Sequence, residues 1–160
     1  MSYKNSKANS GFTIIEVLIV LAIAGLILLI VFLAVPALQR NSRNTAIKND
    51  VQNVLGGVSE FQGANNGKLP STTNGVSGTG TITYTAGTGS TQTSINIQGT
   101  TKVTTVATAP TANGSVPQGE IQIVIGKKCD GSSSTRAVAA YYMIETTAAA
   151  SATAPTCVES

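Results

Sequence analysis

The feature that most constrains this chain is an unbroken apolar stretch near its N-terminus with one carboxylate at its start. Residues 17–35 carry no polar side chain, and Glu16 stands directly before them. As a helix, residues 12–35 would be about 36 Å long at about 1.5 Å per residue. The hydrocarbon core of a bilayer is only about 30 Å thick. An ionisable group inside such a span is costly, so Glu16 indicates a function.

A short polar segment with two lysines precedes the apolar stretch. In a secretory signal, a cleavage site of small residues follows the apolar part. Here residues 36–40 continue directly into a helical pattern instead. The stretch is also too long for the apolar region of such a signal. We therefore expect residues 12–35 to be retained as a transmembrane helix.

Apolar residues continue at helical spacing beyond the span, in steps of three and four that predict one buried stripe. Asn65, Asn66 and Gly67 supply a stop signal, and Pro70 prevents continuation. The simplest interpretation is one helix over residues 12–65, with an amphipathic half over residues 36–66. Pro36 predicts a kink, because proline removes a helical hydrogen bond and clashes with the preceding turn. The stripe comprises Leu38, Ile47, Val51, Val54, Leu55, Val58 and Phe61.

The rest of the chain is rich in threonine, serine and glycine and poor in charge. We expect residues 67–118 to be a connecting region with weak strands, and residues 119–160 to hold two stronger strands joined by a turn at Asp130 and Gly131. The sequence thus predicts an α+β fold in which a small antiparallel sheet packs on the second half of the helix. The candidate strands are residues 81–85, 94–98, 101–106, 120–125 and 136–145.

The two cysteines, Cys129 and Cys157, both lie in the C-terminal third of the chain. They form no Cys-x-x-Cys pair and have no histidine beside them, which argues against zinc and redox motifs. A bridge between them would close a loop of roughly 29 residues and contribute about 3–4 kcal/mol. We favour this disulfide because an exported domain follows the span. The alternative is two separate buried thiols.

Few residues are suited to catalysis. The absence of histidine from the sequence removes Ser-His and Cys-His nucleophile systems. The acidic residues are scattered singly, so we predict no metal site, no cofactor and no catalytic residue, although folding could still bring two carboxylates together. Without the two lysines of the polar segment, eight basic and seven acidic residues remain. That balance does not predict direct nucleic-acid binding.

The N-terminal block is a specific motif. It reads Gly-Phe-Thr-Ile-Ile-Glu over residues 11–16 and runs into the apolar stretch. It resembles the class III signal of type IV pilins and their relatives, whose prepilin peptidase cuts after the glycine and whose new N-terminal phenylalanine is methylated. By this resemblance residues 1–11 are a leader, the cut falls between Gly11 and Phe12, Phe12 is methylated, and Glu16 is the fifth mature residue.

The resemblance also implies roles for other residues. Thr13 and Glu16 would serve assembly and register, and a neighbouring Phe12 amine would neutralise the Glu16 carboxylate. Gly25 matches a glycine usual in the middle of the span. With Pro36, which lies about three residues later than the family's usual proline, it would bracket a flexible stretch of helix. The paired cysteines resemble the bridged C-terminal region of many pilins.

The implied fold is pilin-like, and the implied function is structural. The chain would be a non-enzymatic subunit, anchored in the cytoplasmic membrane with its head outside, that polymerises into an extracellular type IV pilus for adhesion, twitching motility or DNA uptake. Its partners would be other pilin subunits, prepilin peptidase and the inner-membrane assembly machinery. The exterior head follows from the resemblance and the cysteines, since basic residues flank both ends of the span.

Two alternatives remain. The first is a pseudopilin of a type II secretion system; the cysteine pair argues against it, because pseudopilin heads are more often held by calcium. The second is a monomeric, membrane-anchored binding or hydrolytic domain, for which apolar length alone suffices and a lone glutamate reaches the interface. An ordinary anchor, however, requires neither Gly11 and Phe12 before the span nor Glu16 at that spacing.

Overall fold

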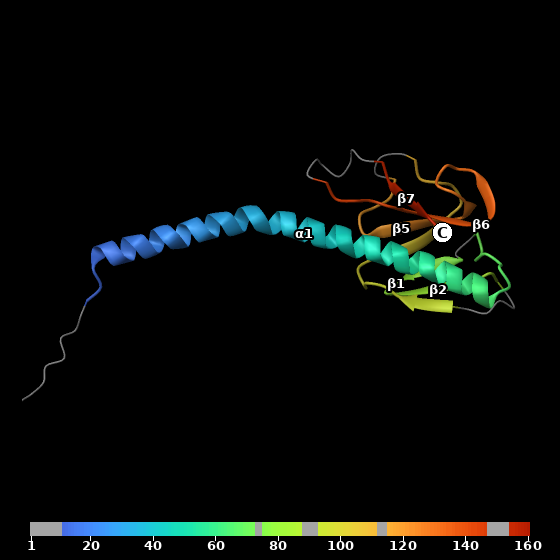
Figure 1. Ribbon diagram of the computed structural model, residues 1–160, viewed down its shortest axis with the longest axis horizontal. Helices are drawn as coiled ribbons and strands as arrows, with labels where there is room; N and C mark the ends of the chain where they lie inside the picture. Colours follow the sequence, from blue (N-terminus) through green and yellow to red (C-terminus); the bar gives the residue numbers. More distant parts are fainter. Residues whose placement is uncertain (1–10, 73–74, 88–92, 112–114, 147–153) are drawn as a thin grey trace, which may run out of the picture. The chain divides into compact units, whose positions relative to one another are not determined.

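The computed structural model describes residues 11–72, 75–87, 93–111, 115–146 and 154–160. In these residues a single long helix, α1 (Ile14–Ala64), precedes all the strands (Figure 1). The chain divides into two compact units, Met1–Gln39 and Arg40–Ser160, and α1 contributes to both. Most of the proposed leader, residues 1–10, lies outside the described residues.

The second unit, which we call the head, contains one seven-stranded sheet in the order β3-β2-β1-β4-β5-β6-β7. All neighbouring strands are antiparallel except β4 and β5, which run parallel. The prediction of an antiparallel sheet is therefore right for five of the six pairs. Residues 107–119 separate β4 from β5, and a parallel pair needs a connection of about that length. The strands are β1 (Val76–Thr79), β2 (Thr81–Tyr84), β3 (Thr93–Asn96), β4 (Lys102–Val106), β5 (Glu120–Lys127), β6 (Ser133–Tyr142) and β7 (Thr156–Glu159).

The second half of α1 packs its apolar stripe on the sheet (Figure 1). Every member of the predicted stripe from Ile47 onward is buried, whereas Leu38 belongs to the first unit and is exposed. The helix ends where the sequence predicts. Asn66 and Gly67 both adopt positive φ, and the Gly67 N–H donates to the Gln62 carbonyl at 2.7 Å, which closes the last turn.

The structure contains two strands that the sequence pattern does not predict. The first, β1, has one buried apolar residue, Val76, and is held by partners on both sides. The second, β7, lies in the C-terminal tail, whose pattern is weak, and pairs with β6 at the edge of the sheet. All five candidate strands overlap strands of the structure.

A close helix–sheet contact lies at the centre of this core. The ring of Tyr84 is fully buried beneath α1, and its hydroxyl donates to the Val54 carbonyl at 2.9 Å. Burial raises the pKa of the Tyr84 phenol, so the group stays protonated and remains a donor. A methyl group at Gly57 would overlap the Tyr84 ring and hydroxyl. The helix can therefore approach β2 this closely because residue 57 is glycine.

The disulfide joins Cys129, in the connection between β5 and β6, to Cys157 in β7, with 5.8 Å between the Cα atoms. This is the pairing favoured from the sequence. The Cys129 N–H also donates to Glu159 Oε2 at 2.9 Å. Both contacts fasten the short edge strand β7 to the rest of the head, so the weak pattern of the tail is offset by a covalent bond.

We predict that Gly57→Ala destabilises the head by about 1–3 kcal/mol, because the added methyl must displace a fully buried ring. The measurement is urea unfolding of the full chain in detergent, followed by the near-ultraviolet signal of the tyrosines. Gly56→Ala is the matched control, since a methyl there meets nothing within 4 Å and alanine favours helix. Equal stability of the two variants would contradict the proposed contact.

Removal of the bridge by Cys129→Ser with Cys157→Ser should lower the free energy of unfolding of the head by about 2–5 kcal/mol. The expected cause is a less restricted unfolded chain together with release of β7. The same urea titration measures it, and wild-type protein under a reducing agent should shift in the same direction. A change below about 0.5 kcal/mol would show that β7 does not need the bridge.

Candidate functional site

The motif that the sequence singled out begins outside the helix. Gly11, Phe12 and Thr13 have no regular secondary structure and are exposed, with 89% of the Phe12 surface accessible. Helical hydrogen bonding begins at the Thr13 carbonyl, which accepts the Val17 N–H at 3.4 Å. The peptide bond between Gly11 and Phe12 therefore lies in non-helical backbone, two residues before the first helical acceptor.

Thr13 and Glu16 close the start of the helix by a reciprocal set of hydrogen bonds. Glu16 Oε2 accepts both the Thr13 N–H and the Thr13 hydroxyl, each at 2.9 Å. In return, Thr13 Oγ1 accepts the Glu16 N–H at 3.4 Å. This is the capping-box geometry, which satisfies backbone donors that a helix start leaves unpaired. The pattern Thr-x-x-Glu before an apolar run is its sequence signal.

The helix that follows exposes its apolar side chains on all sides. Among the described residues nothing buries the apolar window of α1, and the helix is long and apolar enough to cross a membrane. Side chains of this kind need lipid or other apolar helices around them, because water solvates them poorly. The large exposed apolar residues include Leu18, Ile19, Leu21, Leu26, Leu29, Phe32 and Leu33.

Gly25 and Pro36 both lie within α1, which continues through them. A methyl group at Gly25 would meet nothing within 4 Å. No close contact among the described residues therefore requires glycine at this position. The kink at Pro36 and the flexible role of the stretch between these residues remain predictions.

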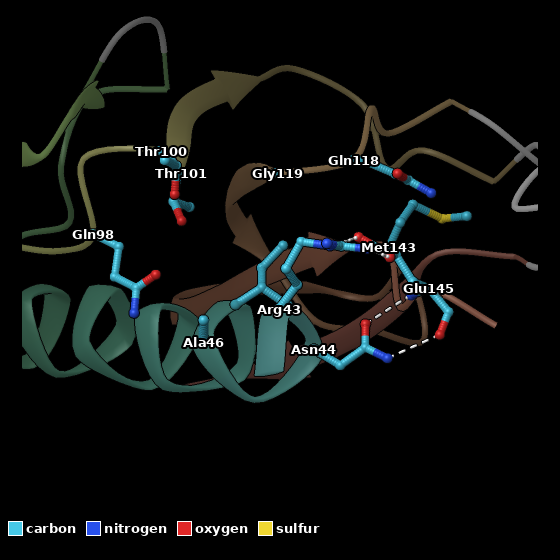
Figure 2. A pocket seen from close by; sticks show the side chains of 11 residues that line it. Arg43, Asn44, Ala46, Gln98, Thr100, Thr101, Gln118, Gly119, Met143 and Glu145 are labelled. Carbon is cyan, nitrogen blue, oxygen red and sulfur yellow. Dashed lines mark hydrogen bonds and ion pairs between the residues drawn. The ribbon is translucent and has the colours of Figure 1, made fainter. Parts of the chain in front are cut away.

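The head contains a pocket of about 330 Å³ (Figure 2). Its walls come from the first turns of α1 that belong to the second unit, from the turns that precede β4 and β5, and from the segment after β6. No sequence motif marked these residues, because they come from four separate parts of the chain. The lining comprises Arg43, Asn44, Ala46, Ile47, Gln98, Thr100, Thr101, Gln118, Gly119, Met143 and Glu145.

Part of the pocket lining is a hydrogen-bonded cluster around Glu145. Arg43 donates two hydrogen bonds of 2.7 Å to the Glu145 carboxylate, and these hold the pKa of that carboxyl below its usual value. The Asn44 side chain pairs with the Glu145 backbone, donating to its carbonyl and accepting its N–H, both at 2.8 Å. The cluster ties the end of β6 to α1.

A buried carboxylate lies beside the pocket. Asp50 is 2% exposed and accepts the Thr101 hydroxyl and the Gln98 N–H. These bonds hold the turn before β4 against α1, and they account for a charged residue in the core. Within the described residues, no group of three or more histidine, cysteine, aspartate or glutamate side chains is placed to hold a metal ion.

A comparison with protein-family models identifies residues 6–32 as a Prokaryotic N-terminal methylation motif. Comparisons with curated proteins and with solved structures gave no significant match. The matched residues contain the capped helix start, the peptide bond between Gly11 and Phe12, and most of the exposed apolar helix. The chain therefore carries at its N-terminus the class III signal of type IV pilins and pseudopilins.

Proposed function

We propose that this protein is a structural subunit of a type IV pilus. Prepilin peptidase would remove residues 1–11, and the mature chain would polymerise through its N-terminal helix. The observation that carries the proposal is the methylation motif at the start of α1, where it runs into an apolar stretch that the described residues leave exposed. The proposal assigns the protein no catalytic role.

The apolar helix supports assembly as well as anchoring. In the precursor, lipid covers the side chains of residues 12–35. In a filament the same side chains would pack against those of neighbouring subunits, so one apolar environment replaces another. The span is in this sense a temporary anchor in the cytoplasmic membrane, and its final location is the core of an extracellular filament.

The cleavage reaction would create the cation that pairs with Glu16 in the filament. Hydrolysis between Gly11 and Phe12 creates an α-amino group on Phe12, and a buried carboxylate needs such a cation. The Phe12 amine of a neighbouring subunit would pair with Glu16 and so set the register between helices. Because an unpaired buried charge is costly, this pair would act mainly on register rather than on gross affinity.

The disulfide favours the pilus over the pseudopilus of a type II secretion system. Cys129 and Cys157 hold the C-terminal strand covalently, which resembles the bridged C-terminal region of many pilins. The sequence resemblance associates pseudopilin heads with calcium instead. We therefore infer an extracellular fibre in an oxidising environment.

We predict that the mature chain begins at Phe12. Mass spectrometry of protein from its native membrane should give a chain that begins at Phe12, with one added methyl group and with both cysteine thiol hydrogens lost. Microscopy of sheared surface material should then show long fibres that contain this chain, whereas short fibres would favour a pseudopilus. A mass that begins at Met1 would contradict the proposal and support a plain membrane anchor.

Glu16→Ala should leave cleavage largely intact and reduce the yield of sheared filaments at least tenfold. The reason is that the variant removes the carboxylate that would pair with the Phe12 amine, whereas the peptide bond between Gly11 and Phe12 is unchanged. Glu60→Ala is the matched control, since Glu60 is an exposed carboxylate on the head half of the same helix. A normal filament yield from Glu16→Ala would refute the pairing.

A further inference from the structure

We infer that the Thr13 hydroxyl is a positioning group for the proposed cleavage: as the cap of α1, it keeps the peptide bond between Gly11 and Phe12 outside the helix. This inference rests on the proposed processing by prepilin peptidase. In that reaction water adds across the peptide bond, so Gly11 leaves as a carboxylate and Phe12 as an amine. The chain must present this bond in an accessible conformation.

The need for a cap follows from the apolar surroundings. The first turn of any helix leaves backbone N–H groups without partners, and each unpaired group is costly where lipid excludes water. An uncapped helix can reduce this cost by extending toward its N-terminus, because the unpaired N–H groups then lie in the polar segment before the apolar stretch, where water can reach them. One more turn would engage the Gly11 carbonyl as a helical acceptor, and a helical peptide bond must unfold locally before a peptidase can cut it.

The structure contains the device that stops this extension. Thr13 Oγ1 accepts the Glu16 N–H, and this hydrogen bond pairs a backbone donor that the helix start would otherwise leave without a partner. The helix therefore starts at Ile14, and Phe12 remains exposed. Glycine at position 11 adds to the barrier, because it is a poor helix former.

The two side chains of the box then have separable tasks. The acceptor that stops the helix is the Thr13 hydroxyl, and its donor is a backbone N–H that every residue at position 16 provides except proline. Glu16→Ala keeps this hydrogen bond and loses the carboxylate. Thr13→Val keeps the carboxylate and the shape of the side chain but loses the hydroxyl. The rate of cleavage should therefore depend on which residue stands at position 13, and filament assembly should depend on which residue stands at position 16.

The test is a series of full-length precursors in lipid vesicles with prepilin peptidase. Thr13→Ser and Thr13→Asn retain a capping acceptor and should be cut within twofold of the wild-type kcat/KM. Thr13→Ala and Thr13→Val lack one and should be cut about threefold to tenfold more slowly. The loss should lie mainly in KM, because few precursors present the bond in the accessible conformation at any moment.

Two controls separate capping from other effects. Thr45→Val removes an exposed hydroxyl from the head half of the same helix, where Thr45 Oγ1 donates to the Asn41 carbonyl at 2.9 Å, and it should be cut like wild type. Glu16→Ala should be cut within twofold of wild type. Carbon chemical shifts of Phe12 in uncut precursors in micelles should be non-helical in wild type and shift toward helix in Thr13→Val.

The outcomes distinguish the two levels of the proposal. A wild-type precursor left uncut between Gly11 and Phe12 would overturn both the proposed function and the role of Thr13. Cleavage of Thr13→Val at the wild-type rate would overturn the role of Thr13 alone, since valine matches threonine in shape but cannot cap. The same holds if Phe12 stays non-helical in that variant.

Discussion

The rest of this structure depends on one constraint: an apolar helix surface that the described residues do not cover. No residue in the apolar window of α1 is buried by the part of the chain that the structure describes. Such a surface must lie in lipid or against other helices. The head therefore has to fold without it, and the core of the second unit uses only the part of α1 from Ile47 onward.

That head is built from a composition with few large side chains. Its strands are rich in threonine and serine, so a few specific contacts supply what a larger apolar core would otherwise provide. Tyr84 fits beneath Gly57, Asp50 fastens the turn before β4, and the disulfide to Cys157 fastens the edge strand. Each contact joins segments that are distant in sequence, which suits a domain whose local strand patterns are weak.

The sequence predicted those parts of the fold that have a local period. The buried stripe of α1 repeats every three to four residues, and its end has the backbone conformation that glycine and asparagine favour. The strands β1 and β7 escaped prediction because their neighbours in the sheet, rather than their own patterns, hold them.

The candidate site likewise has a part that the sequence could predict and a part that it could not. Thr13 and Glu16 lie three residues apart, and a local motif is sufficient to find them. The contact of Arg43 and Asn44 with Glu145 spans about a hundred residues, so no local pattern in one sequence could place it. The contact between Gly57 and Tyr84 could not be predicted from the sequence either. A glycine within a helix is expected only to destabilise it, and the packing reason for Gly57 becomes visible only with the buried ring of Tyr84 in place.

In the proposed function, the capped helix start would connect cleavage with assembly through charge. In the precursor, residues 12–35 carry one carboxylate and no cation, and Thr13 supplies hydrogen bonds to that carboxylate within the same turn. Cleavage at Gly11 would remove the leader with its two lysines and add one positive charge at Phe12. The apolar helix would then be electrically neutral overall. Burying a neutral helix in an apolar core costs less free energy than burying a helix with a lone charge, provided that each of its two charges pairs with the opposite charge of a neighbouring helix. The same hydrolysis that frees the subunit from its leader would thus also fit its helix for burial among others.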